Sequence, residues 1–82
     1  MNNFFYVYIL TSIIEPSRHY IGITNDLDKR LKEHNRGHVI HTSKYTPWEY
    51  ETVIAFRSKE KAQMFEKYLK THSGRSFSSK HF

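Results

Sequence analysis

The sequence predicts an α/β fold made of three strands and two helices in the order β-β-α-β-α. Segments rich in aromatic and branched side chains predict strands over 4–10, 19–24 and 50–56. Segments with apolar residues at helical spacing follow the second and third of these strands. A chain of 82 residues buries only about 60% of its unfolded surface, which is too little to divide between two cores. We therefore expect one domain over 1–82, with a core over about 4–72 and a basic aromatic tail over 73–82.

Composition and charge favour a polyanionic partner. The net charge is +5 and the pI is about 9.6, and excess Lys and Arg attract nucleic acid by releasing its condensed counterions. The chain has no cysteine, which excludes disulfides and thiolate zinc ligands and fits a reducing cytoplasm. No apolar run approaches the roughly 20 residues of a membrane-spanning helix, and the first residues lack a basic export signal. We expect a soluble, cytoplasmic protein without a membrane partner.

The first two strands place two tyrosines on one face of a hairpin. If the hairpin is centred near Ile14, Tyr8 and Tyr20 lie roughly opposite one another, and cross-strand partners share a face. Gly22 falls on the same face and leaves room for a group to approach the backbone. The default interpretation is a pair of core aromatics, while the gap beside two hydroxyls suggests a site.

The helix after the second strand carries a guanidinium near its apolar stripe. Asn25 or Asp26 caps this helix, which ends at about Arg36 before Gly37. The residues that share its inward stripe are Leu27, Leu31 and His34. Arg30 lies at the edge of the stripe, where its planar, always charged fork suits phosphate oxygens. The alternative for Arg30 is a structural ion pair.

The second helix carries an isolated carboxylate on its inward face. Ser58 caps a helix from Lys59 to about Thr71, and Glu66 interrupts its apolar stripe. A buried carboxylate is costly unless it is paired or binds a cation. Periodicity alone leaves two explanations open. One is a salt bridge to Arg30 or Lys70, or simple exposure, and the other is a functional site with a bound metal.

The histidines and the remaining cations add candidates for hydrogen bonding and DNA contact. His34, His38 and His41 suggest a zinc site, since His34 and His38 have i, i+4 spacing, but Gly37 breaks the helix between them and no carboxylate or thiolate completes the set. His34 is better explained as a hydrogen-bonding group beside Arg30, and His41 as an auxiliary group on the following loop. Candidate phosphate contacts are Lys29, Lys32, Arg36, Lys44 and Arg75. An ordinary solvated basic surface is the alternative for each of these cations.

These residues together resemble the GIY-YIG nuclease domain family, in its small single-domain form related to the N-terminal domain of the excinuclease incision subunit. The likeness covers roughly 4–77. Its motifs are Tyr6-Val7-Tyr8, Tyr20-Ile21-Gly22, then Arg30 with His34 one turn later, and Glu66. The chain differs from the family pattern at Tyr6, which replaces the glycine of the first motif, and at Ile23, where repair-type members carry lysine.

The resemblance implies both a fold and a reaction. It implies an α+β sandwich in which a three-stranded antiparallel sheet is flanked by helices. It also implies a divalent-metal-dependent DNA endonuclease, using Mg²⁺ or Mn²⁺ in DNA repair or recombination, in which Glu66 holds the metal. The implied catalytic residues are Tyr8, Tyr20, Arg30 and His34. We expect a protein partner for targeting. The alternatives are a catalytically weak nucleic-acid-binding or structure-sensing module and a protein-interaction adaptor.

Overall fold

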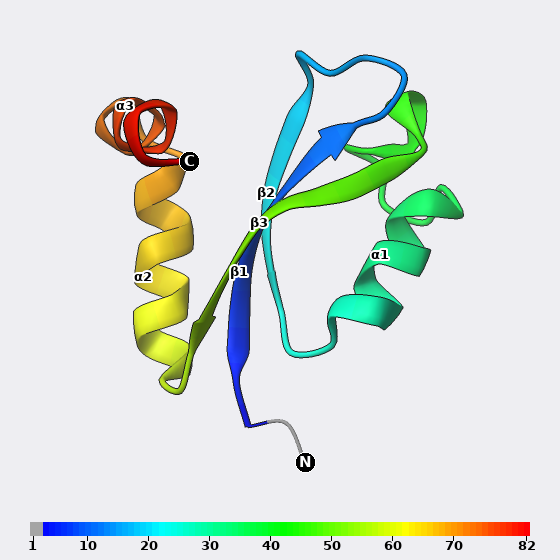
Figure 1. The fold of residues 1–82 in the computed structure, drawn as a ribbon. Coiled ribbons are helices and arrows are strands. Elements are labelled where there is room, and N and C mark those ends of the chain that lie inside the picture. Colours follow the sequence, from blue (N-terminus) through cyan, green and yellow to red (C-terminus); the bar gives the residue numbers. More distant parts are fainter. Residues whose placement is uncertain (1–2) are drawn as a thin grey trace.

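The computed structural model describes residues 3–82 and confirms the predicted α+β architecture (Figure 1). The elements, in chain order, are β1 (Phe5–Ser12), β2 (His19–Thr24), α1 (Leu27–Asn35), a 3₁₀ turn (Ser43–Tyr45), β3 (Trp48–Phe56), α2 (Lys59–Leu69) and α3 (His72–His81). The three strands form one sheet in the order β2-β1-β3, and both pairings are antiparallel. The central strand is therefore β1, which carries the first tyrosine motif.

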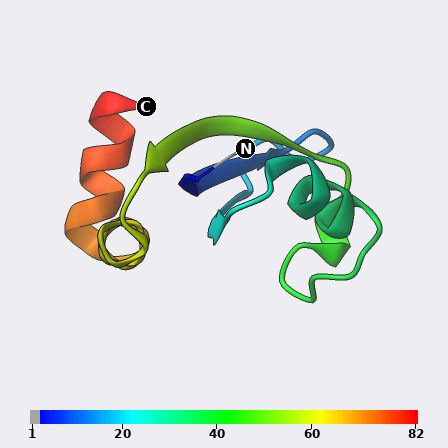
Figure 2. The ribbon, with the colours of Figure 1, turned by 90° about the horizontal axis from the view of Figure 1, so that it is seen from below.

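The helices cover opposite faces of this sheet. Figures 1 and 2 show α2 and α3 together on one side and α1 on the other. The α2 side buries Val7 against Ala62 and Leu69. The α1 side buries Tyr8 and Leu10 with Trp48. The alternation of β1 side chains thus creates two separate cores. None of the helices in the described part is long and apolar enough to cross a membrane.

The capping residues fix both predicted helices close to their expected bounds. The Asp26 side chain accepts a hydrogen bond from the Lys29 amide at 3.1 Å, and α1 begins there. Gly37, at φ 77°, supplies the left-handed conformation after its last turn. The Ser58 hydroxyl accepts from the Lys61 amide and starts α2. These expectations are confirmed within about two residues.

The hairpin register corrects one detail of the prediction. Tyr8 pairs with Gly22, and Tyr20 pairs with Leu10, so the two tyrosines share a face but lie diagonally rather than opposite. The predicted centre at Ile14 is wrong by one residue, since the chain turns between Ser12 and Arg18. The space over Gly22 holds the Tyr8 ring itself. A Cβ added at Gly22 would lie 2.4 Å from the Tyr8 hydroxyl oxygen.

The segment that was expected to be a tail forms the helix α3. Its composition is poor in strong helix formers, so the sequence did not predict it. The Thr71 hydroxyl caps it, and Gly74 brings it against the end of α2. A Cβ at Gly74 would clash with the backbone oxygen of Tyr68. Phe77 packs edge-on against Phe65, which docks α3 on the core of the α2 side.

Candidate active site

A chain of buried hydrogen bonds runs through Tyr8 on the α1 side of the sheet. Tyr8 and His34 are both 0% exposed. The Tyr8 hydroxyl lies 2.8 Å from His34 Nε2, and Arg30 Nε donates to the Tyr8 oxygen at 3.2 Å. The sequence predicted that these three residues form one group, and the structure brings them into direct contact. Their convergence depends on the Asp26 cap, which sets the rotation of α1.

Thr42 determines the direction of the hydrogen bonds. Its hydroxyl donates to the Val39 carbonyl at 3.3 Å, because a carbonyl can only accept, and it lies 2.7 Å from His34 Nδ1. With its single proton committed, the Thr42 oxygen accepts from Nδ1–H of His34. Nε2 of the neutral ring then accepts from the Tyr8 hydroxyl. Donation therefore runs in one direction, from Arg30 to Tyr8 to His34 to Thr42.

Burial keeps both titratable members of this chain uncharged. Burial, together with the nearby Arg30 charge, lowers the pKa of His34 to about 4. Burial also raises the pKa of Tyr8, against the opposing hydrogen bond and charge of Arg30, and the charges of Tyr20 and Glu66 add to the rise. At neutral pH His34 is thus a free proton acceptor and Tyr8 still holds its proton.

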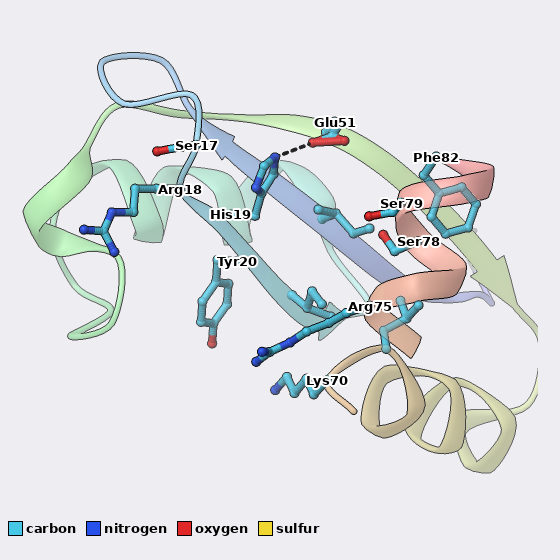
Figure 3. A pocket seen from close by; sticks show the side chains of 13 residues that line it. Ser17, Arg18, His19, Tyr20, Glu51, Lys70, Arg75, Ser78, Ser79 and Phe82 are labelled. Carbon is cyan, nitrogen blue, oxygen red and sulfur yellow. Dashed lines mark ion pairs between the residues drawn. The ribbon is translucent and has the colours of Figure 1, made fainter. Parts of the chain in front are cut away.

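Tyr20 forms the open side of the cluster. Its ring packs edge-on against His34 at 5.2 Å between centroids and lies tilted against Tyr8 at 6.5 Å. The side chain is only half-buried, and Figure 3 shows its hydroxyl pointing away from the sheet toward Arg75 and Lys70. Tyr20 therefore links the buried chain to the surface.

The guanidinium of Arg30 has a carboxylate partner that the sequence analysis did not name. Arg30 Nη1 lies 3.1 Å from Glu33 Oε1, one turn along α1. The expected structural partner, Glu66, is not paired with Arg30. The i, i+3 spacing of Arg30 and Glu33 is a signal that could have revealed this pair. About a third of the Arg30 side chain is exposed, which leaves other N–H groups available to a ligand.

Glu66 lies on the helix that covers the other face of the sheet. This helix, α2, packs with Val7 on the face opposite α1, so Glu66 does not come from the same side of the sheet as Arg30 and His34. The carboxylate is 16% exposed and lies 2.7 Å from Lys70 Nζ, which is the ion pair that the sequence analysis kept as an alternative. Its charge still acts on Tyr8 and raises the pKa of that residue.

The donor set around Glu66 suits a hard divalent cation that keeps most of its water. Within residues 3–82 no three His, Asp or Glu side chains gather at a common point. Mg²⁺ is commonly held by one or two carboxylates together with water and substrate phosphates. A single, largely buried carboxylate fits that mode of binding and does not fit a closed zinc site.

Comparison with known proteins decides the family. The model of the GIY-YIG catalytic domain matches residues 4–80. The chain belongs to the GIY-YIG family. The predicted resemblance is thereby confirmed. Within the cluster, Tyr8 lies in the first of the two tyrosine motifs, and Arg30 and His34 lie on the helix α1 that follows the second.

Curated relatives of this GIY-YIG domain are subunits of structure-specific endonucleases. A structure-specific endonuclease subunit SLX1 homolog of Giardia intestinalis is 37% identical over 75 residues, covering 87% of this chain and 21% of that protein. The structure-specific endonuclease subunit slx1 of Talaromyces marneffei is 41% identical over 69 residues, covering 77% and 18% respectively. The chain thus spans about a fifth of the length of these relatives.

The predicted DNA-contacting cations of the GIY-YIG domain lie in separate places. Lys29, Lys32 and Arg36 are exposed on α1. Lys44 is exposed in the 3₁₀ turn with its ammonium 5.8 Å from the Tyr45 ring centre. Arg75 is exposed on α3, which lies across the sheet from α1. No single face of the sheet therefore holds all five.

Two residues in the loop after α1 differ in whether they contact the buried cluster. His41, the predicted auxiliary group, is exposed, and within the part of the chain that the structure describes no hydrogen bond joins it to the cluster. Thr42 is fully buried and completes the hydrogen-bond chain, although the sequence analysis missed it. This loop has no periodicity that could have indicated which of its side chains points inward.

Proposed function

We propose that this chain is a divalent-metal-dependent endonuclease that hydrolyses DNA phosphodiester bonds in repair or recombination. The observation that carries the proposal is the one-directional chain of hydrogen bonds from Arg30 through Tyr8 to His34, with the charge of Glu66 acting on Tyr8 from the other side of the sheet. It combines a fixed cation, a hydroxyl and a neutral proton acceptor, which are the groups that an in-line displacement at phosphorus needs.

In the proposed reaction Arg30 stabilises charge on the phosphate. The Tyr8 oxygen holds Nε, and Glu33 holds Nη1, so the orientation of the guanidinium is set before substrate arrives. The N–H groups that these partners leave free can donate to the non-bridging phosphate oxygens. Charge on these oxygens grows as the water attacks, and a preorganised donor then gains strength without reorganisation.

Tyr8 and His34 would take the proton from the attacking water. Tyr8 is 0% exposed, and Arg30 Nε occupies one lone pair of its oxygen. The second lone pair would accept from a water that enters at the Tyr20 side, while the guanidinium stays on its Tyr8 and Glu33 anchors. The Tyr8 oxygen accepts the water proton while its own proton moves to His34 Nε2. The resulting hydroxide attacks phosphorus, and the 3′ oxygen leaves.

Tyr20 would orient the water at the open side. Its hydroxyl is on the exposed part of the cluster, and among residues 3–82 it makes no hydrogen bond to another side chain. It can therefore accept from or donate to a water next to Tyr8.

Glu66 would hold the Mg²⁺ or Mn²⁺ ion. A bound divalent cation supplies Lewis-acid stabilisation of the phosphate and of the leaving oxygen. The Lys70 ammonium, 2.7 Å from Glu66, must leave the carboxylate for this to happen. That ion pair is also the observation that favours a second candidate, a nucleic-acid-binding module on the same fold that cleaves poorly.

The proposal includes a protein partner. The relatives named above are endonuclease subunits, and this chain matches only about a fifth of their length. A basic domain of this size has sequence-blind phosphate contacts and little surface with which to select a site on DNA. Targeting would then come from a second protein.

The test uses purified protein with plasmid, flap and branched DNA in Mg²⁺, Mn²⁺ or EDTA. We expect cleavage in either metal, none in EDTA, and a loss of about 100-fold or more in Arg30→Ala. Cleavage that is unchanged in both Arg30→Ala and Glu66→Ala would refute the site. Metal-independent DNA binding without cleavage would favour the second candidate.

A further inference from the structure

A groove opens between the sheet and α3, next to Tyr20. Its volume is about 610 Å³, within the roughly 300–1,000 Å³ range of ligand pockets. Ile9 and Ile21 form its floor, on the face of the sheet opposite α1. The face of α3 that lines it consists of Arg75, Ser78, Ser79 and Phe82, at the helical spacing i, i+3, i+4, i+7. Figure 3 shows these side chains along one edge.

The groove is positively charged at the end that meets the proposed active site. Lys70 and Arg75 both line it, and Figure 3 shows their cationic ends close to the Tyr20 hydroxyl. Lys70 is paired with Glu66, whereas in the described part of the chain Arg75 has no acidic partner. Two neighbouring cations with one carboxylate between them leave an unmatched positive charge, which attracts an anion.

The acidic group in the groove, Glu51, is engaged by two neighbouring side chains. Glu51 Oε2 accepts from the Thr11 hydroxyl at 2.6 Å and lies 3.1 Å from His19 Nε2. These partners occupy the carboxylate and hold it against the sheet, as the dashed line in Figure 3 indicates for His19. The remaining polar groups on the α3 edge are the Ser78 and Ser79 hydroxyls, which can donate to phosphate oxygens.

Aromatic side chains stand at opposite ends of the groove. Tyr20 is half-buried at the active-site end, and Phe82 is 43% exposed at the far end of α3. Their partly exposed rings above an apolar floor offer stacking surfaces for bases. Cations that follow a backbone, combined with aromatic platforms, are the features with which proteins bind single strands. A duplex is too wide for a cavity of this volume.

We propose that this groove binds a single-stranded stretch of the nucleic acid as it leaves the active site. The position that we infer for the strand rests on the proposed function. Its single-stranded character rests on the groove itself. Phosphates lie against Arg75, Lys70 and the serine hydroxyls, while bases face Tyr20 and Phe82. The α1 cations remain available to the duplex part of the substrate.

The test is binding of a labelled oligothymidylate of about ten nucleotides, measured by fluorescence anisotropy in EDTA so that no cleavage occurs. Ser79→Asp places a carboxylate in the groove, and Ser76→Asp places the same charge on the same helix outside it. We expect Ser79→Asp to weaken binding about tenfold and Ser76→Asp to change it less than about twofold. Equal effects of the two substitutions on binding would overturn the proposal that the groove binds the strand.

A second variant removes the unpaired cation. Arg75→Ala should weaken binding and lower the salt dependence by about 0.7 in the slope of log K against log salt, the value of one single-strand phosphate contact. Lys61→Ala, which removes a charge from the far end of α2, serves as the control and should leave the slope unchanged. An unchanged slope in Arg75→Ala contradicts the proposal. Urea unfolding of each variant verifies that it is folded.

The outcomes separate this inference from the proposed function. If the wild type cleaves DNA but both groove variants bind the single strand normally, the groove assignment fails and the nuclease assignment stands. If the protein does not cleave DNA but its single-strand binding depends on Ser79 and Arg75, the groove stands and the nuclease assignment fails.

Discussion

The two faces of the sheet are packed in different ways, one by apolar side chains and the other by hydrogen-bonded polar ones. The α2 side is apolar, with Val7, Ala62 and Leu69 surrounded by partly buried aromatic rings. The α1 side places a tyrosine, a histidine and a threonine at full burial, and joins them by hydrogen bonds. Both faces contact the same central strand β1, whose alternating side chains serve one core each.

This difference in packing indicates that one side of the sheet serves stability and the other serves catalysis. Burying an apolar side chain stabilises the fold directly, while a buried polar group adds little unless every partner is present. On the α1 side every partner is present, since no buried side-chain nitrogen or oxygen in residues 3–82 lacks a hydrogen bond. We infer that the α1 side is retained for its proton chain, and that the α2 side supplies most of the stability and contributes one carboxylate.

The largest effect is expected from replacing Glu66, the carboxylate that α2 contributes from the side of the sheet that supplies most of the stability. Glu66→Gln should lower the single-turnover cleavage rate about a thousandfold or more, because metal binding supplies several kcal/mol to the transition state. Stability should change by less than about 1 kcal/mol, since the only pair lost is the partly exposed contact with Lys70. A large loss of stability with normal cleavage would reverse the assignment of Glu66.

The second prediction concerns the apolar core itself. Leu69→Ala should cost about 2–5 kcal/mol in the free energy of unfolding, measured with urea, because Leu69 is fully buried. Cleavage per folded molecule at low temperature should remain close to wild type. Met64→Ala, at a side chain 70% exposed on the same helix, is the control and should change stability by less than about 0.5 kcal/mol. Similar losses in both variants would contradict the packing described for α2.

The third prediction uses pH to test the polar core. The pKa of His34 falls from 6.5 to about 4 on folding, so between these values the unfolded chain binds the extra proton. Stability from this group is present above pH 6.5 and is lost as pH falls toward 4, by roughly 3 kcal/mol in total. His34→Gln should remove this component from the urea-derived pH profile. Identical pH slopes in wild type and variant would show that His34 is not neutral and buried in the folded protein.

The smallest predicted effect concerns the ion pair at Glu66. Lys70→Gln removes the competing ammonium, and Mn²⁺ binding measured by electron paramagnetic resonance should tighten up to about fivefold, the size of a partly exposed ion pair. Lys67→Gln is the control, because Lys67 is exposed on α2 and makes no ion pair among the described residues. Weaker Mn²⁺ binding in Lys70→Gln would mean that Lys70 supports the metal rather than competing with it.

The sequence predicted the parts of the fold that local chemistry specifies. Caps at Asp26 and Ser58 and the positive φ of Gly37 are short-range signals, and they placed α1 and α2 closely. The helix α3 also has a local cap at Thr71, but its composition is poor in strong helix formers. Its formation depends on the contact of Phe77 with Phe65 and on the close approach at Gly74, which are tertiary effects.

The site was predictable to the extent that its residues lie on regular elements. Arg30 and His34 share a helix face, so their meeting with Tyr8 followed from periodicity and the family motifs. Thr42 lies in a loop without periodicity, and no local rule places it next to His34. The side of the sheet from which Glu66 approaches depends on where α2 packs, and helix periodicity does not specify that.

The most direct test of the account is the effect of Tyr8→Phe, which removes one oxygen from the buried chain. The account predicts that the variant folds, with a stability loss of about 1–3 kcal/mol from the unpaired His34 nitrogen. Its single-turnover DNA cleavage rate should fall at least about 100-fold, because Arg30 loses its anchor and the water loses its path to His34. A folded Tyr8→Phe protein that cleaves DNA at the wild-type rate would contradict the account.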